Sequence, residues 1–454
     1  MHPRRSLRRS NAHFTRAVER LPLGVSSNFR YWGDDKTIYV AKGRGARIWD
    51  IDGNVYIDYR LGYGPIILGY CDSRVDAAAR KAQEEIGPVF ALATEGEWRL
   101  AERFCALVPN AELVRFSVTG TEAVETAIRL ARAYTGKDGY VTVEGSYHGQ
   151  SDLTLWYAGL KNWSGRGDPD IYPLSEGIPA RLREMFWQVP LNDANRLEDL
   201  LKREGQRIAA FLLEPILGNC CSIAAERQYL QDVRRLCDSY GVVLIFDEVK
   251  TGFRVAKGGA QELYGVRADL ATFAKAMGNG YPIAAIAGRA EIMRKLGKGV
   301  AHGGTYAGHA MCLAAAEKTL EILSETTALA DIAEYGLELR EEIGALLRTR
   351  GIAHCFSGPP ALQGLFFRET LPRNYRDWKQ SDYTLYDTLA AELIERGVLV
   401  EPDSREPWFA CEAHDETCLE ETLERFEDAL DAALEKLAPQ RTPAAAPSEH
   451  HPSL

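Results

Sequence analysis

The sequence predicts an α/β fold, with a large domain in which helices flank a mainly parallel β-sheet and a smaller α+β domain. Three observations lead to this prediction. The chain has 454 residues, too many for one ordinary core and enough for two or three packed sub-domains. From about residue 85, short β-rich apolar runs alternate with helical periodicity, which is typical of a parallel sheet covered on both faces. Beyond about residue 325, the order becomes helix, strands and a last helix.

The chain begins with the Arg-rich stretch MHPRRSLRRS. Because this stretch lacks the apolar segment of a secretory signal, we expect residues 1–20 to be a frayed basic arm, with a transit peptide as the alternative. Residues 21–84 form the next segment. Within it, two alternating runs flank DGN in residues 47–58, which predicts a β-hairpin with a tight turn.

Residues 85–325 are predicted to form the large domain. Five β-rich runs bounded by turn residues predict its strands: Val114–Val118, Tyr140–Val143, Ile208–Leu213, Val242–Phe246 and Ile283–Ala287. In a parallel sheet covered by helices, ligands bind at the carboxyl ends of the strands, so functional residues are expected at that edge.

Residues 326–438 are predicted to form the small domain together with the N-terminal segment. They contain a helix, two strands at Leu362–Phe367 and Val398–Val400, and a final amphipathic helix near Cys418–Leu437. We expect this part to pair with the N-terminal hairpin. Residues 439–454 are rich in Pro, Ala and Ser, which predicts a disordered tail.

The composition excludes several classes of function. A formal net charge of −10 is mild for this length and argues against nucleic acid as a partner. No run approaches the roughly 18 apolar residues of a membrane helix, so no membrane partner is expected. The nine cysteines lack the paired short spacings of a zinc site, which predicts no metal site and reduced thiols in a cytoplasmic protein.

A first candidate site lies in residues 118–136, VTGTEAVETAIRLARAYTG. A strand ends at Val118, and a Gly-Thr turn opens a helix with apolar residues at helical spacing. Such a turn presents backbone N–H groups and a hydroxyl where the helix dipole favours an anion, which predicts a phosphate site at Gly120 and Thr121. The alternative is that Thr121 is an ordinary helix cap.

Two charged residues at the ends of apolar runs form a second candidate site. In VVLIFDEVKTGFR, a run of apolar residues leads into Asp247, whose buried carboxylate needs a cationic partner or strong hydrogen bonds. In DLATFAKAMGNGYP, Lys275 follows a short apolar run. A single lysine there would extend its amine to solvent. A buried Asp and a buried Lys downstream of a Gly-Thr turn together match a pyridoxal 5′-phosphate site.

Pyridoxal 5′-phosphate chemistry needs each of these residue types. The amine of Lys275 forms the Schiff base and later moves the proton, and the carboxylate of Asp247 keeps the pyridine nitrogen protonated. We therefore predict that Lys275 and Asp247 are the catalytic residues. A cofactor-binding protein without catalysis is an alternative from another class. The joint presence of Lys275, Asp247 and Thr121 argues against it.

The motifs LIFDEVKTGFR and DLATFAK resemble those of the class III (ω) aminotransferases, and within them those of the glutamate-1-semialdehyde 2,1-aminomutases. The resemblance runs from about Leu23 to Leu437, nearly the whole chain. It implies the pyridoxal-phosphate fold of type I and pyridoxal 5′-phosphate as the cofactor. It also implies a homodimer with active sites shared between chains, in which Thr305, in HGGTYAGH, reaches the phosphate bound by the neighbouring subunit.

The resemblance implies further cofactor contacts in the same chain. Gly120 and Thr121 resemble the phosphate ligands. Tyr147, in EGSYHG, resembles the aromatic residue that stacks on one face of the ring, with His148 beside it, and Val249 would pack on the opposite face.

The polar edge of the cofactor ring has its own implied partners. Asp247 would pair with the pyridine nitrogen. Glu214 and Asn219, in LLEPILGN, resemble the residues near the ring hydroxyl and near Asp247.

Four residues are implied on the substrate side. LGVSSNFR resembles the aminomutase segment in which a serine and an arginine, here Ser27 and Arg30, receive the substrate, and a guanidinium suits a carboxylate. Tyr63 stands where that group has tryptophan. Glu406, in PDSREPWF, resembles a substrate-side glutamate.

Departures from the resemblance concern the expected mouth of the site. The loop after Tyr157, AGLKNWSGRGDPD, lacks the small-residue pattern of the aminomutase gating loop, and His309, His302 and Ala301 replace an asparagine, a glutamine and a tyrosine. We therefore predict an aminotransferase that moves an amino group between a small-molecule amino donor and a carbonyl acceptor by a ping-pong mechanism. The alternative is intramolecular exchange of the aminomutase type, and a racemase or decarboxylase is a further alternative.

Overall fold

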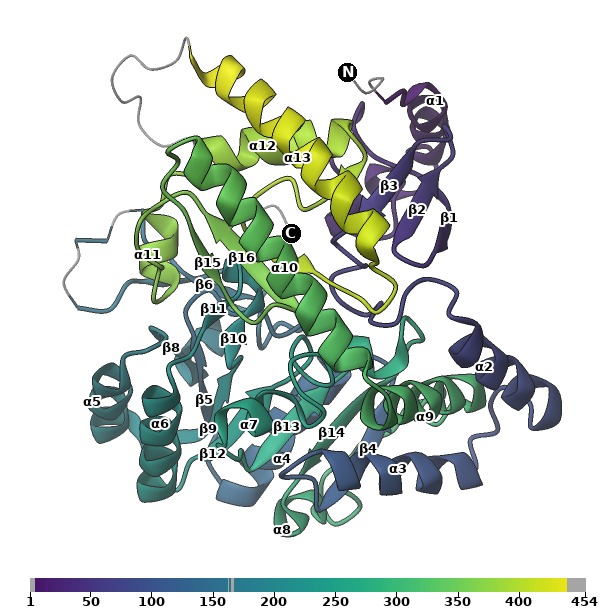
Figure 1. The fold of residues 1–454 in the computed structure, drawn as a ribbon. Coiled ribbons are helices and arrows are strands. Elements are labelled where there is room, and N and C mark those ends of the chain that lie inside the picture. Colours follow the sequence, from purple (N-terminus) through teal and green to yellow (C-terminus); the bar gives the residue numbers. More distant parts are fainter. Residues whose placement is uncertain (1–4, 162, 165–166, 439–454) are drawn as a thin grey trace.

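The computed structural model describes residues 5–161, 163–164 and 167–438. At its centre lies a seven-stranded sheet in the order β4-β14-β13-β12-β9-β5-β8 (Figure 1). In that order the strands span Leu113–Ser117, Ala284–Gly288, Leu270–Phe273, Val243–Asp247, Ile208–Leu213, Gly139–Val143 and Phe186–Val189. Neighbouring strands are parallel except where β14 pairs with β13 and β4, so the predicted mainly parallel sheet is confirmed.

All five strands predicted for this sheet are present, with bounds that differ from the prediction by a single residue or not at all. Strands β13 and β8, which have four residues each, were not predicted from the sequence. Runs of that length are too short for periodicity to distinguish a strand from an apolar turn of a helix.

Helices cover both faces of the sheet. In chain order they are α2 (Ser73–Glu85), α3 (Glu95–Leu107), α4 (Gly120–Thr135), α5 (Ala194–Glu204), α6 (Arg227–Tyr240), α7 (Gly259–Tyr264), α8 (Ala290–Met293) and α9 (Ala310–Glu325). Two small two-stranded sheets pair β6 (Trp156–Ala158) with β7 (Ile171–Pro173) and β10 (Ile216–Leu217) with β11 (Ile223–Ala224).

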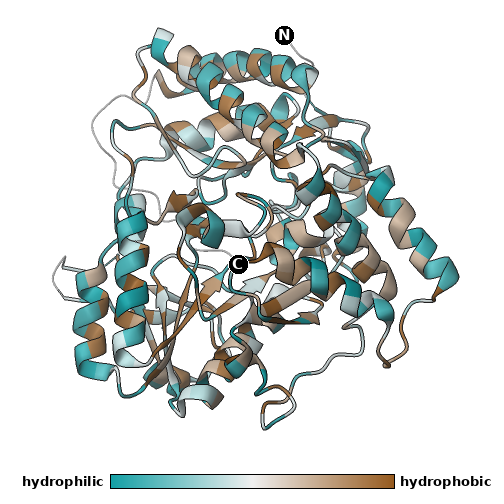
Figure 2. Ribbon diagram, turned by 60° about the horizontal axis from the view of Figure 1, so that its bottom comes forward, coloured by the Kyte–Doolittle hydropathy of each residue, from teal (hydrophilic) through white to brown (hydrophobic). Residues whose placement is uncertain are grey.

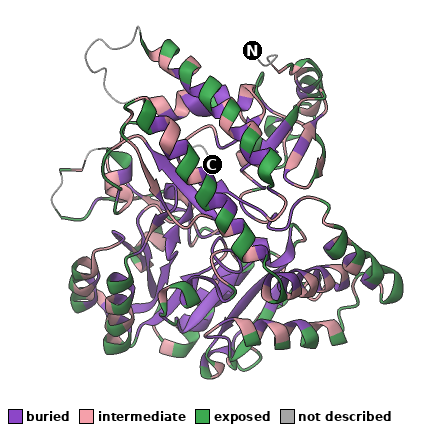
Figure 3. Cartoon of the chain, viewed as in Figure 1, coloured by how far each residue is buried: buried purple, intermediate pink, exposed green. Residues whose placement is uncertain are grey.

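The alternation of side chains along β12 divides the core of the large domain. Val243 and Ile245 pack in one cluster with α4, whereas Leu244 and Phe246 pack in another with α6. Because successive side chains of a strand point to opposite faces, α4 and α6 cover opposite faces of the sheet. The sheet is buried while the flanking helices expose their outer sides (Figure 3), and these helices carry mixed apolar and polar residues (Figure 2).

A smaller unit is built from both ends of the chain. Strands β1 (Val40–Arg44), β2 (Arg47–Asp50), β3 (Val55–Asp58) and β17 (Val398–Leu399) form a four-stranded sheet in that order. The predicted hairpin is the antiparallel pair of β2 and β3, and β17 joins β3 in parallel. The expected pairing of the two ends of the chain is confirmed.

The rest of the smaller unit is C-terminal. Its helices are α10 (Ala328–Thr349), α11 (Tyr375–Lys379), α12 (Thr384–Glu395) and α13 (Glu416–Leu437), and its second sheet joins β15 (Cys355–Ser357), β16 (Leu362–Phe366) and β18 (Trp408–Phe409). Helix α13 packs against α12 and α10 (Figure 1). None of the helices in the described part of the chain is long and apolar enough to cross a bilayer.

The N-terminal arm differs from the expectation. Instead of fraying, Arg8–Ala17 form helix α1, and the carboxylate of Asp52 in the hairpin turn accepts hydrogen bonds from the backbone N–H (2.8 Å) and hydroxyl (2.6 Å) of Ser10. Arg5 also forms an ion pair of 2.7 Å with Glu395. Docking on the hairpin therefore orders this segment. The predicted tail, residues 439–454, lies outside the described residues.

Candidate active site

Two neighbouring parallel strands bring the predicted catalytic residues to one edge of the sheet. Asp247 is the last residue of β12 and pairs in register with Thr272 of β13. Lys275 lies two residues after the end of β13, so both residues lie at the carboxyl ends of their strands, where ligands bind in such sheets. Lys275 has a φ of 48°, in the left-handed region, and strained backbone of this kind is concentrated at functional sites.

The carboxylate of Asp247 is buried and held by three hydrogen-bond partners. One oxygen lies 2.7 Å from Nδ1 of His148, and the other accepts hydrogen bonds from the backbone N–H of Val249 at 3.0 Å and from the hydroxyl of Thr272 at 3.2 Å. These contacts hold the carboxylate plane in one orientation. The other ring nitrogen of His148, Nε2, is buried and has no hydrogen-bond partner among the described residues.

The amine of Lys275 has an altered acidity. Burial, together with the charge of Lys250, lowers its pKa to about 7, although the carboxylates of Glu406, Glu214 and Asp247 act in the opposite direction. A lysine with a pKa near 7 is present in part as the free amine at neutral pH. The free amine is the form that attacks an aldehyde and accepts a proton.

The Gly-Thr turn lies against these two segments. The position that a Cβ atom would take on Gly120 is 3.1 Å from Val249 and 3.8 Å from Ala274, the residue before Lys275. Helix α4 is capped by Thr119, which forms a capping box with Glu122. The alternative interpretation of Thr121 as the helix cap is therefore wrong.

The hydroxyl of Thr121 instead lies close to the segment that follows Tyr147. It accepts a hydrogen bond of 3.3 Å from the backbone N–H of Gln150. A Cβ atom on Gly149 would approach this hydroxyl to 2.5 Å, so only glycine leaves it room. The N-terminus of a long helix, an accessible hydroxyl and neighbouring backbone N–H groups suit a phosphate group.

Glu214 organises the segment on which Tyr147 lies. Its carboxylate accepts hydrogen bonds from the backbone N–H of Tyr147 at 2.8 Å and of Gly218 at 3.1 Å. Burial raises the pKa of Glu214, whereas the charges of His148 and Lys250 act to lower it. The side-chain oxygen of Asn219 accepts a hydrogen bond of 2.8 Å from Lys250.

The predicted substrate residues lie around an aromatic cluster. Ser27 is partly buried and Arg30 is exposed, at the two ends of a short 3₁₀ turn. Between them, the ring of Phe29 makes edge contacts with Tyr147 at 6.0 Å and with Tyr63 at 5.9 Å between ring centroids. Phe29 therefore connects the predicted substrate segment to the predicted stacking residue.

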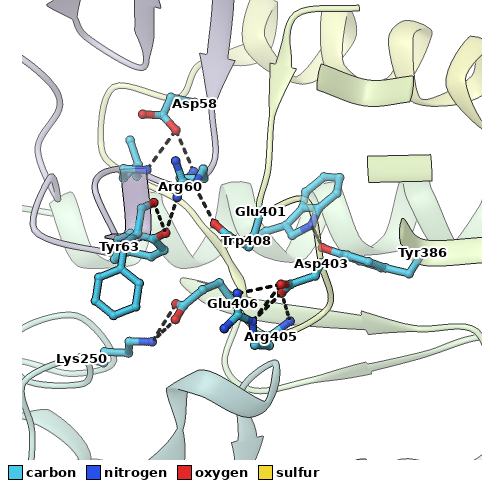
Figure 4. A network of polar contacts seen from close by, with 12 residues as sticks. Asp58, Arg60, Tyr63, Lys250, Tyr386, Glu401, Asp403, Arg405, Glu406 and Trp408 are labelled. Carbon is cyan, nitrogen blue, oxygen red and sulfur yellow. Dashed lines mark hydrogen bonds and ion pairs between the residues drawn. The ribbon is translucent and has the colours of Figure 1, made fainter. Parts of the chain in front are cut away.

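A polar network lines this side of the site (Figure 4). Arg60 donates a hydrogen bond of 2.8 Å to Glu401 and contacts the hydroxyl of Tyr63, which donates to the backbone oxygen of Phe29 at 3.2 Å. Burial raises the pKa of Glu401 to about 7, although Arg60 opposes the shift. Glu406, predicted on the substrate side, forms an ion pair of 2.7 Å with Lys250.

Several residues of this network were missed by the sequence analysis: Phe29, Arg60, Lys250, Glu401 and Arg405. The sequence contained a signal for Lys250, because this residue follows the same buried strand from which Asp247 was predicted. The others are single residues in loops, and their partners are remote in the sequence. Thr305 is exposed, and within one chain its neighbours Gly303, Gly304 and Tyr306 are exposed too.

The chemistry of these side chains and of the helix N-terminus fits pyridoxal 5′-phosphate. A buried carboxylate fixed by a histidine suits a protonated ring nitrogen, the lysine suits an aldehyde, and the glycine-lined helix N-terminus suits the phosphate. Over the residues described, there is no group of three or more His, Cys, Asp or Glu side chains placed to hold a metal ion.

The chain is similar to known proteins of one family over most of its length. The Aminotransferase class-III family profile matches residues 30–405. The glutamate-1-semialdehyde 2,1-aminomutase of Methanothermobacter thermautotrophicus is 40% identical over 424 residues, 93% of this chain and 99% of that protein. An ω-transaminase structure from Sphaerobacter thermophilus, 30% identical, has a TM-score of 0.86 and covers 93% of this chain and 97% of its own. The structure of a Sphingopyxis sp. MTA144 protein with pyridoxal phosphate, 30% identical, has a TM-score of 0.83. The match covers 95% of this chain and 97% of that protein.

Proposed function

The chain belongs to the class III aminotransferase family and is an enzyme with pyridoxal 5′-phosphate as its cofactor, and on this premise we propose that it exchanges an amino group and a carbonyl group within one small carboxylate-bearing substrate. The observation that carries amino transfer is the position of Lys275 beside the buried Asp247–His148 pair. The relatives named as glutamate-1-semialdehyde 2,1-aminomutases, 36–40% identical, support the intramolecular reaction. They support this alternative better than the intermolecular transfer that the sequence analysis put first.

When bound, the cofactor supplies an aldehyde carbon and a conjugated ring that draws electrons from the substrate. In this proposal, Lys275 would hold the cofactor through its aldehyde group. When the amine of Lys275 is free, it would take a proton from the substrate carbon that carries nitrogen and later return it. Its pKa of about 7 suits both directions of this transfer, because a group near the working pH both accepts and donates a proton.

The remaining cofactor residues bind and orient in this proposal. Asp247, held by His148 and Thr272, would accept a hydrogen bond from the protonated ring nitrogen. The turn at Gly120 and Thr121 would bind the phosphate. On the substrate side, the guanidinium of Arg30, which is exposed and forms no ion pair within the described part of the chain, would receive a carboxylate.

Intermolecular transamination is a second candidate, favoured by the charges of the 401–406 segment. An aminomutase has to retain a diamine, and its second ammonium requires a carboxylate. The three carboxylates of this segment are already ion-paired: Glu401 with Arg60, Asp403 with Arg405, and Glu406 with Lys250. A segment whose carboxylates are all ion-paired retains a second ammonium poorly, and this observation favours transfer between two molecules.

The homodimer with shared sites also belongs to this proposal. Tyr306, next to Thr305, is 63% exposed, and it lines an apolar hollow of about 280 Å³ together with Val118, Tyr281, Pro282, His309, Met311 and Cys312. Exposed apolar surface of this kind suits a protein interface. We also propose a cytoplasmic location, which the nine free cysteines support.

One experiment separates the two reactions. The holoenzyme is mixed with glutamate 1-semialdehyde alone and, separately, with L-alanine, β-alanine or L-glutamate and no carbonyl acceptor. An aminomutase isomerises the semialdehyde over many turnovers and releases no keto acid from the amino acids. A transaminase releases one equivalent of keto product per site from a donor alone. If the protein does neither, the proposed function is wrong.

A further inference from the structure

Lys250 is a buried lysine that the amino-transfer chemistry described above does not use. Its ammonium donates to both oxygens of Glu406, at 2.7 and 2.9 Å, and to the side-chain oxygen of Asn219 at 2.8 Å. Lys250 is 7% exposed and Glu406 is 9% exposed. Three acceptors around three N–H donors satisfy the ammonium completely, which a buried lysine requires.

The path of the Lys250 side chain is built into the fold. Lys250 follows β12, and its chain passes over Gly218, where a Cβ atom would come within 2.1 Å of Cδ and 2.6 Å of Nζ. Gly218 is in turn held by Glu214 through its backbone N–H, at 3.1 Å. A glycine is therefore needed for the ammonium to reach Glu406, and Glu214 fixes both this glycine and Tyr147.

The pair lies within electrostatic reach of the cofactor lysine. The charge of Lys250 lowers the pKa of Lys275, and among the carboxylates Glu406 opposes this shift more than Glu214 or Asp247 does. Glu406 also raises the pKa of Tyr147. The titratable groups with the largest effects on Lys275 are thus Lys250, Glu406, Glu214 and Asp247, and of these four Lys250 is the cation.

We propose that Lys250 is a positioning residue of the amino-transfer site: it binds Glu406 and Asn219 together and fixes a charge-balanced pair, one ammonium and one carboxylate, beside Lys275. The pair lets Glu406 face the site without adding a net negative charge that would keep Lys275 protonated. This inference rests on the proposed role of Lys275 as the cofactor lysine.

The pair also connects the two domains, because Lys250 follows a strand of the large sheet and Glu406 precedes β18. A purely structural ion pair would change the stability of the protein when removed. It would not change the protonation of the bond between Lys275 and the cofactor. The pH at which the visible absorption band of the holoenzyme shifts measures this protonation, so it distinguishes positioning from structure.

The experiment compares holoenzymes of wild type, Lys250→Met, Glu406→Gln and the double variant by pH titration of that band. Lys250→Met leaves Glu406 unbalanced and is expected to raise the midpoint by about one pH unit or more, a tenfold change in the protonation equilibrium. Glu406→Gln is expected to lower it, and the double variant to lie between the two. Lys257→Met is the control, because Lys257 is exposed and donates only to the backbone of Ser324.

Midpoints of Lys250→Met and Glu406→Gln that equal the wild-type value would overturn the inference. If Lys250→Met does not fold, as judged by circular dichroism, the nearly isosteric Glu406→Gln decides alone. Borohydride reduction of each holoenzyme and mapping of the labelled peptide are done in parallel. A label on a lysine other than Lys275 would instead contradict the proposed function, so the two failures are distinguishable.

Discussion

Nδ1 of His148 lies 2.7 Å from Oδ2 of Asp247, and both side chains are almost completely buried. The histidine follows Tyr147, the residue expected to stack on the cofactor, in the loop after β5. The aspartate ends β12, and β9 lies between β12 and β5 in the sheet. A buried carboxylate needs hydrogen bonds or a cation to offset its desolvation. The contact therefore holds Asp247 in place and ties it to the stacking segment.

Lys275→Ala is expected to remove the borohydride-reducible link to the cofactor. Turnover should fall by at least about 10⁴-fold, because both the covalent attachment and the proton-transferring base are lost. The measurement is reduction followed by peptide mass analysis, together with steady-state activity. Lys257→Ala is the control and should keep both properties. A reduced pyridoxyl group on another lysine of the wild type would contradict the assignment.

Asp247→Asn is expected to keep the fold and slow the chemical step. The neutral amide no longer stabilises a protonated ring nitrogen, and loss of one such electrostatic contact costs on the order of 10²–10³-fold in rate. Single-turnover mixing of the holoenzyme with its amino substrate measures this step. Asp238→Asn, at an exposed position on α6, is the matched control. An unchanged single-turnover rate in Asp247→Asn would rule out this role.

The free amine of Lys275 is expected to titrate near pH 7 in the apoenzyme. Burial and the charge of Lys250 disfavour the ammonium, so the folded chain binds fewer protons here than the unfolded chain between pH 7 and the ordinary lysine value near 10.5. This group therefore adds stability as pH rises through that window. The rate of labelling by an amine-reactive reagent at Lys275 should rise with a midpoint near pH 7. A midpoint near that of exposed lysines would contradict the shift.

Arg30→Lys is expected to weaken binding of a carboxylate substrate by about tenfold. A point charge replaces a planar fork, and the lost hydrogen bond to a charged group is worth roughly 1.5 kcal/mol. The apparent KM should rise while kcat changes little. Arg294→Lys, at an exposed position after α8, serves as the control. The role is excluded if amines without a carboxylate react as well as amino acids in the wild type.

Thr305 is expected to serve the cofactor of a partner chain. In a mixed dimer of Lys275→Ala with Thr305→Ala, one site would then carry both lesions and the other neither. Mixing the two inactive or impaired variants should partly restore activity, measured against each variant alone at the same total concentration. No recovery would mean that Thr305 acts on its own chain. A fully active monomer at assay concentration would also exclude shared sites.

The sequence by itself determined where most strands of the large sheet lie along the chain and which residues stand at their ends. Five strands of the large sheet, the hairpin and the position of Asp247 after a buried run follow from patterns only a few residues long. Such patterns depend on local geometry, because a buried strand needs apolar residues and its end is where a charge can be tolerated. Lys275 was identified in the same way.

Only the tertiary structure decided which side chains meet. His148 and Asp247, Lys250 and Glu406, and Arg60 and Glu401 are pairs from distant segments, and Glu406 lies 156 residues beyond Lys250. Local patterns carry no information about such pairs, since each is created by the packing of one segment on another. The same reason explains the N-terminal helix, which looks like a loose basic arm in the sequence and is held by Asp52 of the hairpin.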